Sequence, residues 1–248
     1  MSQIDSKSSQ NSLFVDIGNT SLKLGYCSSG SWKVPDRDIS TTESLIQWLL
    51  EEETTFNRIV VASVRKDLTA RLQSAITEME IVLVNLEGIN HQRLNYDTPQ
   101  SLGIDRYLGC LGAWYDCNQP VVVIDSGTAC TLDYMDAEGI YQGGVIMPGI
   151  TVLQNAFNDF APELPLSERI IPSNWPGKNT AESLQWGQFG LYLDGVRSIL
   201  ARYQKHQGDF RLYLTGGDAK ELSRHLNIPC KRDPFLIFKG MVAYLKER

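Results

Sequence analysis

Two stretches of the sequence place an aspartate directly after a run of apolar residues. VVVIDSGTACTLDY puts Asp125 after four β-branched residues, and LFVDIGNTSLKLGY puts Asp16 after a second apolar run. Such runs are typical of strands buried on both faces, where an ionised carboxylate would be costly. We therefore expect each aspartate at the carboxyl end of its strand, facing a cleft.

Each aspartate is followed two residues later by a glycine, Gly18 in the first stretch and Gly127 in the second. Glycine allows a tight turn into a returning strand. The backbone N–H groups of such a turn can bind phosphate oxygens, and its carboxylate can bind a cation, so two facing turns would clamp a polyphosphate. The alternative for each is an ordinary hairpin, because Asp, Gly and Asn are favoured in turns for local reasons.

Two further motifs could contribute to such a site. LYLTGGDA, residues 212–219, ends an apolar strand in paired glycines, which let the backbone approach a base or ribose closely; a plain β–α turn is the alternative. Asp105 and Arg106 are adjacent. The aspartate could act as a base toward an alcohol, and the guanidinium could pair with the carboxylate of a substrate. The alternative is that this pair caps a helix that starts near Ser101.

The elements that would position these motifs alternate between strand and helix patterns, which predicts an α/β architecture. The expected strands are 13–17, 21–27, 58–64, 81–84, 121–125, 131–134, 140–146 and 211–214, and the expected helices are 42–52, 68–79, 101–115, 180–203 and 234–246. The two aspartates lie 109 positions apart (125 minus 16), which favours a duplicated domain. We expect a disordered extension over 1–12, one domain over 13–118 and a second over 119–248.

The composition narrows the classes of function. The chain has 248 residues, 42% hydrophobic and 21% charged, with a net charge of −6, so nucleic acid is not expected as its main partner. No apolar run approaches the roughly 20 residues of a membrane helix, and the polar N-terminus does not resemble a signal peptide. Five cysteines without a CxxC pair predict buried thiols in a reducing cytoplasm. GxxxxGK[ST], GxGxxG and GxSxG are absent, so a nucleotide would bind by another route.

Taken in order, five segments resemble type III pantothenate kinases, over about residues 13–248. They are DIGNTSLK (16–23), YDTPQSLGIDR (96–106), DSGTACTLD (125–133), GGVIMPG (143–149) and TGGDA (215–219). This family is part of the actin, sugar-kinase and heat-shock-chaperone ATPase superfamily, so the resemblance implies two duplicated ribonuclease-H-like domains with a cleft between them. It also implies a cytoplasmic homodimer that uses ATP to phosphorylate pantothenate to 4′-phosphopantothenate, the first step of coenzyme A biosynthesis.

The resemblance further implies roles for single residues. The residues that would hold the ATP phosphates are Asp16, Ile17, Gly18, Asn19, Thr20, Ser21, Leu22 and Lys23, with Asp16 near Mg²⁺. Asp125 would bind a monovalent cation, K⁺ or NH₄⁺, and Thr128 would contact ATP. The residues that would bind pantothenate are Tyr96, Gly103, Ile104, Asp105, Arg106 and Thr180. Asp105 would be the proton acceptor.

One residue departs from the family pattern, and two other classes compete with an enzyme. Ser126 stands where the family usually has a smaller apolar residue, and this removes no functional group. A non-catalytic relative, such as the family's accessory factors in transcription, would have no chemical reason to retain Asp16, Asp105 and Asp125. A filament-forming or chaperone-type ATPase would carry large inserted subdomains, for which 248 residues leave no room. The sequence therefore favours an enzyme.

Overall fold

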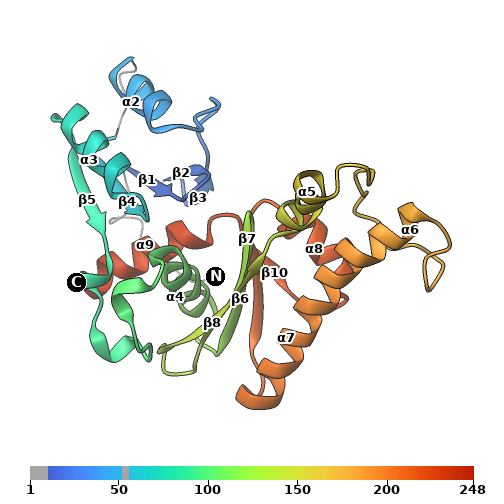
Figure 1. Ribbon diagram of the computed structural model, residues 1–248. Helices are drawn as coiled ribbons and strands as arrows, with labels where there is room; N and C mark the ends of the chain where they lie inside the picture. The colour runs from blue at the N-terminus through green and yellow to red at the C-terminus, as the bar shows by residue number, and fades with distance from the viewer. Residues whose placement is uncertain (1–10, 52–55) are drawn as a thin grey trace. The chain divides into compact units, whose positions relative to one another are not determined.

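The computed structural model describes residues 11–51 and 56–248, and the chain divides into two compact units (Figure 1). The first unit comprises the chain up to Gln119, then Met135–Gly143 and Pro234–Arg248, and the second comprises Pro120–Tyr134 and Gly144–Asp233. The predicted second domain over 119–248 includes the C-terminal helix, which the structure instead groups with the first unit. Most of the predicted extension over 1–12 lies outside the described residues.

A five-stranded sheet forms the first unit, in the order β3-β2-β1-β4-β5. Its strands are β1 (Ser12–Ile17), β2 (Leu22–Ser28), β3 (Ser31–Lys33), β4 (Arg58–Ser63) and β5 (Glu80–Val84). The central strand β1 is antiparallel to β2 and parallel to β4, and β5 is parallel to β4. Every residue of β1 is buried, as its continuous apolar run predicts. The three-residue strand β3 was not predicted.

In the described part of the first unit, the helices that accompany this sheet are α2 (Thr42–Glu51), α3 (Lys66–Ala75), α4 (Ile104–Cys117) and α9 (Leu236–Glu247). Between β5 and α4 the chain forms three short 3-10 turns, at Leu86–Gly88, His91–Arg93 and Pro99–Ser101. Helices α4 and α9 cross in close backbone contact. A Cβ added to Gly112 would lie 2.3 Å from the Leu236 carbonyl oxygen, and one added to Gly240 would lie 2.0 Å from the Leu108 carbonyl oxygen. These two glycines therefore fix α4 firmly against α9.

The second sheet has the order β10-β9-β6-β7-β8. Its strands are β6 (Val121–Ser126), β7 (Ala129–Met135), β8 (Tyr141–Pro148), β9 (Arg211–Thr215) and β10 (Lys231–Arg232). In chain order, both sheets place their strands third, second, first, fourth, fifth. The fourth strand is parallel to the first in both, since β6 pairs with β9 as β1 pairs with β4. The predicted duplication of an α/β domain is confirmed.

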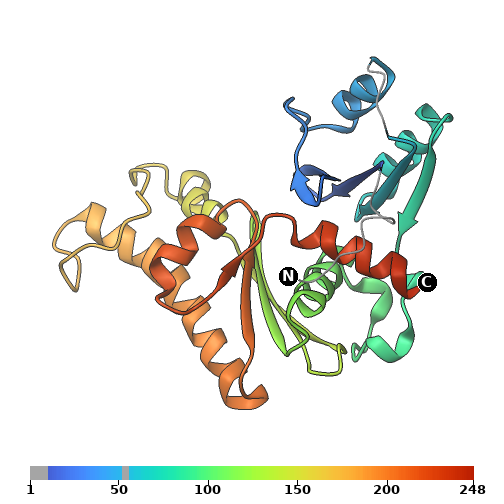
Figure 2. The ribbon, with the colours of Figure 1, turned by 180° about the vertical axis from the view of Figure 1, so that it is seen from behind.

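The helices of the second unit are α5 (Ile150–Phe160), α6 (Thr180–Gln185), α7 (Leu191–Gln207) and α8 (Ala219–Leu226). A single helix was predicted over 180–203, but a π-helical turn at Trp186–Gly190 separates α6 from α7. Figure 2 shows α7 running beside the sheet, where its buried residues join the sheet's core. Helix α5 was not predicted. No helix in the described part of the chain is long and apolar enough to cross a bilayer.

Candidate active site

The first aspartate turn joins β1 to β2 in the first unit. Asp16 is the second-last residue of β1 and is 5% exposed, and its register partners are Lys23 on β2 and Ala62 on β4. The Gly18 N–H donates to the Ser21 carbonyl oxygen at 2.9 Å and closes the turn. The intervening side chains, from Asn19 to Ser21, are exposed. The turn therefore presents amides and hydroxyls to solvent beside a buried carboxylate.

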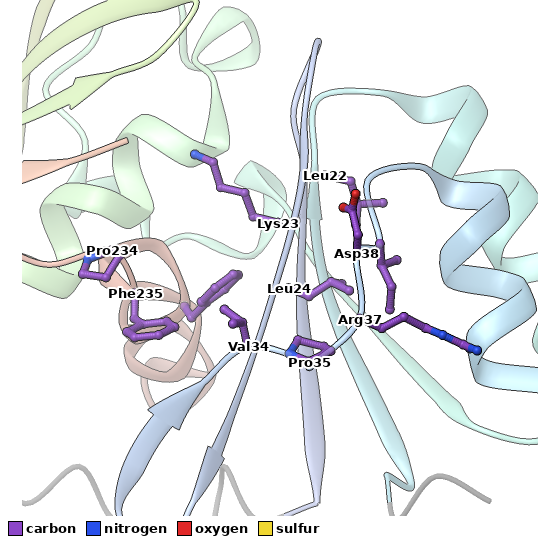
Figure 3. A pocket seen from close by; sticks show the side chains of 11 residues that line it. Leu22, Lys23, Leu24, Val34, Pro35, Arg37, Asp38, Pro234 and Phe235 are labelled. Atoms are coloured by element: carbon purple, nitrogen blue, oxygen red, sulfur yellow. The ribbon is translucent and has the colours of Figure 1, made fainter. Parts of the chain in front are cut away.

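A pocket of about 460 Å³ lies beside this turn, within the first unit. Its lining combines the start of β2, the segment 34–39 and the beginning of α9. Figure 3 shows Lys23 on the same side of β2 as Phe235, with Asp38 on the other side. Lys23, the last residue of the predicted phosphate segment, thus lines a pocket that is large enough for a small ligand.

The second aspartate turn joins β6 to β7 and lies at the meeting point of three motifs. Asp125 is the second-last residue of β6 and pairs in register with Thr215 of the TGGDA segment. The Asp218 N–H donates to the Ser126 carbonyl oxygen at 3.0 Å, and the Gly149 N–H donates to the Thr128 carbonyl oxygen at 2.9 Å. The structure therefore brings together DSGT, the Pro-Gly turn and TGGDA, which the sequence separates by up to 90 positions.

Gly216 shows how closely this turn is packed. Its φ is +90°, in the left-handed region that side chains rarely adopt. A Cβ there would also lie 2.4 Å from the Asp125 Oδ1 and 2.4 Å from the Ser126 carbonyl oxygen. The first of the paired glycines is therefore needed because the backbone of one loop lies directly against the carboxylate of the other.

Ser126, the residue that departs from the family pattern, is fully buried and has a specific partner. Its Oγ lies 2.7 Å from the Tyr192 Oη on α7, and Tyr192 is itself 1% exposed. Burial raises the pKa of the Tyr192 phenol, so this group stays protonated. Burial also raises the pKa of the neighbouring Cys130 thiol to about 11, which makes it unreactive. The hydroxyl of Ser126 therefore anchors the turn to a helix.

Arg169 is a residue near this site that the sequence did not reveal. Its Nη1 donates to the Asp218 Oδ1 at 2.7 Å and to the Glu221 Oε2 at 2.9 Å, while other guanidinium nitrogens donate to Thr151 and Gln154. Both carboxylates raise the pKa of Arg169 against the opposing effect of burial. Arg169 thus links the segment before α6 to TGGDA and to α5. No sequence motif surrounds Arg169 that could have indicated these contacts.

The residues expected to bind pantothenate, Gly103 to Arg106, lie at the start of α4 in the first unit. Gly103 is the N-cap, and the Asp105 Oδ1 accepts from the Arg106 N–H at 3.0 Å. A Cβ on Gly103 would lie 2.4 Å from that Oδ1, so a larger residue would displace the carboxylate. The positive end of the helix favours a negative charge here. The helix begins at Ile104, three residues later than the predicted start near Ser101, and Asp105 lies inside its first turn rather than at the N-cap.

Thr180 is the first residue of α6 in the second unit, and its side chain is exposed. The preceding Asn179 caps the helix by accepting from the Glu182 N–H at 2.9 Å. Hydrogen bonds from the Lys178 N–H and the Asn174 side chain lower the pKa of Glu182 and hold it ionised. This cap fixes the exposed position of Thr180.

The predicted residues are therefore divided between the units. The first unit holds Asp16–Lys23, Tyr96 and Gly103–Arg106, and the second holds Asp125, Thr128 and Thr180. No group of three or more His, Cys, Asp or Glu side chains that could hold a metal occurs among residues 11–51 and 56–248. A cation here would instead take single carboxylate oxygens with backbone or ligand oxygens, which suits the hard ions Mg²⁺ and K⁺.

Two sheets with the same strand order, each with an aspartate at the end of its central strand, define the fold class of actin-like ATPases and sugar kinases. A Campylobacter jejuni structure described as a Baf family transcriptional activator superposes with a TM-score of 0.63 at 24% identity, covering 95% of this chain and 98% of that one. The Listeria monocytogenes protein Lmo2764, described as an N-acetylmannosamine kinase, superposes with a TM-score of 0.53 at 15% identity, covering 95% and 99%. These likenesses establish the fold.

The family follows from the sequence comparisons. The model for type III pantothenate kinase matches residues 12–202. A type III pantothenate kinase from Sulfurihydrogenibium sp. (strain YO3AOP1) is 29% identical over 245 residues, covering 92% of this chain and 97% of the relative. The chain belongs to the type III pantothenate kinase family. Its class of activity is thus ATP-dependent phosphorylation of pantothenate, a step of coenzyme A biosynthesis.

Proposed function

We propose that the chain transfers the γ-phosphoryl group of ATP to the 4′ hydroxyl of pantothenate through the residues that the sequence singled out. The observation that carries this proposal is the repeated strand–aspartate–glycine turn at the central strand of both sheets. In the first turn, the backbone from Asp16 to Lys23 binds the phosphates. In the second, Thr128 contacts the nucleotide at an exposed position beside TGGDA.

On the acceptor side, Asp105 takes the proton of the attacking hydroxyl and Arg106 pairs with the pantothenate carboxylate. Phosphoryl transfer depends mostly on positioning and charge neutralisation, so a single aligned base and a guanidinium are sufficient protein groups here. Support comes from the position of Asp105 in the first turn of α4, a helix held rigidly by its contact with α9. Tyr96 and Gly103 complete the pantothenate contacts within this unit.

Two cations fit the oxygen groups at the turns. Asp16 would lie near the Mg²⁺ that accompanies ATP, since its buried carboxylate is next to the backbone that we propose binds the phosphates. Asp125 would hold a monovalent cation, K⁺ or NH₄⁺, with its carboxylate against the Gly216 backbone. These ions neutralise phosphate charge when bound. The chain's own contribution is to fix the carboxylates at strand ends.

The test of the proposal is ATP consumption measured with and without pantothenate. Strict dependence on pantothenate, with 4′-phosphopantothenate as product, is the expected result. ATP hydrolysis that proceeds equally without pantothenate would indicate an ATPase of another kind, and the absence of any turnover with both substrates and Mg²⁺ would indicate a non-catalytic relative.

We also propose that the chain works as a cytoplasmic homodimer through an apolar face of the second unit. The large exposed apolar side chains of this unit include Phe160 at 88%, Trp175 at 74% and Leu166 at 70% exposure. Others on α5, the segment before α6 and the start of α7 are Val152, Phe157, Ile170 and Leu191. Isolated exposed apolar residues are ordinary, but a set of large ones on neighbouring segments is typical of a surface that a partner covers.

Light scattering tests the dimer, and a mixture of inactive subunits tests whether it shares sites. The wild type should have twice the chain mass, and Phe160→Ser with Trp175→Ser should shift it toward the monomer. If Thr180 reaches the partner's pantothenate, a Thr180→Ala subunit mixed with an Asp105→Asn subunit should recover activity. A monomeric wild type would refute the dimer, whereas a dimer without recovery would restrict each site to one chain.

A further inference from the structure

Tyr141, the first residue of β8, connects two parts of the acceptor site within the first unit. It is completely buried. Its ring centroid lies 6.0 Å from that of Tyr96 and 6.2 Å from that of Tyr107, with tilted and edge-on geometry. Aromatic rings at such distances attract one another beyond the area that they bury. Tyr96 is an expected pantothenate contact, and Tyr107 follows Arg106 directly on α4.

The segment that carries Tyr96 is docked along the start of β8 like a short extra strand. Leu94 forms a parallel bridge with Tyr141, and the Asn95 N–H donates to the Tyr141 carbonyl oxygen at 2.9 Å. The Asn95 Nδ2 donates to the Gln142 Oε1 at 2.5 Å. These bonds fix the backbone of an otherwise irregular segment immediately before Tyr96.

Gln142 is fixed in turn by the hairpin that precedes it. Its Nε2 donates to the Asp136 Oδ2 at 2.5 Å, while the Asp136 Oδ1 accepts from the N–H groups of Glu138 and Ile140. Gly143, with φ of +96°, presents its backbone to the Tyr96 ring, since a Cβ there would lie 3.6 Å from a ring carbon. Tyr96 therefore packs against both the Tyr141 ring and the Gly143 backbone of β8.

We propose that Tyr141 is a positioning residue that sets the distance between Tyr96 and the start of α4, and so shapes the pantothenate pocket from behind. Its ring packs against the rings of Tyr96 and Tyr107, and its carbonyl oxygen accepts a hydrogen bond from the segment that carries Tyr96. Tyr141 itself is buried and does not touch substrate. This inference rests on the proposed function, because Tyr96 and Asp105 are pantothenate contacts only if that proposal holds.

The test compares KM values for the two substrates in three variants of the full-length chain. Tyr141→Leu should raise the KM for pantothenate on the order of fivefold to tenfold, the size of lost aromatic contacts, and leave the KM for ATP within about twofold. Tyr141→Phe keeps the ring and should restore the KM for pantothenate to within about twofold of wild type. Asn95→Ala removes an exposed side chain together with its hydrogen bond to Gln142, and should raise the KM for pantothenate by about twofold to threefold.

Trp48→Leu is the matched control, because Trp48 is a buried aromatic residue of the same unit whose ring packs near Phe56 in the core cluster of β1, β4 and α2. It should lower the melting temperature without changing either KM selectively. Equal KM values for pantothenate in Tyr141→Leu and wild type would overturn the inference, as would a parallel rise in both KM values. If Tyr141→Leu does not fold, an unchanged KM for pantothenate in Asn95→Ala overturns it. A wild type that consumes ATP without pantothenate would instead refute the proposed function itself.

Discussion

The two aspartate turns share a local sequence pattern and a strand position but differ in what surrounds them. The turn after β1 is closed by its own Gly18–Ser21 hydrogen bond, and a Cβ on Gly18 would meet only Ser21. The turn after β6 is hydrogen-bonded to the TGGDA and Pro-Gly loops and to a helix through Tyr192. The same duplicated motif is therefore an exposed turn beside a pocket in the first unit and a tightly packed turn in the second.

This difference suggests a division of work between the units. An exposed turn can adjust to the phosphates of a ligand, whereas a turn fixed on three sides holds a carboxylate in place before a ligand arrives. The proposed pantothenate contacts on α4 belong to the same unit as the exposed turn. We therefore expect a variant of Asp105 in the first unit to affect turnover, and variants of the turn after β6 in the second unit to affect stability and nucleotide or cation affinity.

The largest expected effect is that of Asp105→Asn. Turnover should fall by on the order of 10²–10⁴, because asparagine keeps the shape of the side chain but cannot accept the hydroxyl proton, while ATP affinity changes less than about tenfold. Steady-state kinetics and nucleotide binding provide the measurements.

Asp67→Asn is the matched control for Asp105→Asn, since Asp67 also lies in the first turn of a helix in the first unit and bonds to an arginine, Arg65. Asp67→Asn should keep normal turnover. If Asp105→Asn behaves in the same way, Asp105 is only a helix-capping residue and the division of work is wrong.

The next effect is steric and compares the first turn with the Pro-Gly loop that packs against the second turn. A Cβ on Gly149 would lie 1.9 Å from the Gly127 carbonyl oxygen, whereas a Cβ on Gly18 would lie 3.2 Å from the Ser21 carbonyl oxygen. Gly149→Ala should lower the free energy of unfolding by about 1–3 kcal/mol through overpacking. Gly18→Ala should cost less than about 1 kcal/mol. Equal losses in denaturant titrations would show that the Pro-Gly loop is not packed more tightly against the second turn than the first turn is packed around Gly18.

Asp125→Asn should weaken binding and leave the fold intact. The KM for ATP and the K⁺ concentration for half-maximal activity should both rise by about tenfold, which is about 1.4 kcal/mol, because a negative charge is lost where the cation would bind. Asp194→Asn removes the same charge from an exposed position on α7 of the same unit and should change neither value. A wild type with equal rates in Na⁺ and K⁺ buffers would contradict the assignment of a cation to Asp125.

The smallest effect concerns the buried pair Ser126 and Tyr192. Tyr192→Phe should cost about 1–2 kcal/mol of folding stability, because it leaves the serine hydroxyl buried without its partner. Adding Ser126→Ala should recover part of that loss, since removing both polar groups is less costly than removing one. Tyr203→Phe breaks another bond from α7 to the sheet, to the Leu132 carbonyl oxygen at 2.8 Å, and should not couple to Ser126. If the losses of folding stability in the two single variants add up to the loss in the double variant, the pair does not anchor the turn.

Local patterns in the sequence predicted most elements of the fold. The runs that precede Asp16 and Asp125 are strands with returning partners, as expected, because a short continuous apolar run bounded by turn residues is typical of a buried strand. Elements without a distinct pattern were missed. Helix α5 follows a Pro-Gly turn, and β3 has three residues and forms only through pairing with β2. The predicted long helix was interrupted by a π-turn whose residues Gln188 and Phe189 are buried.

The sequence by itself determined the duplicated strand–aspartate–glycine turns, the order of the motifs and the chain's membership of a kinase family. Those features are local in the chain, so short-range chemistry makes them visible. Only the tertiary structure decided the partners of Ser126, the clamp at Arg169 and the position of Tyr141 between Tyr96 and Tyr107. The contacts of Arg169 and Ser126 join residues 49 and 66 positions apart, and no local pattern records which distant side chain will fill a given space in a packed core.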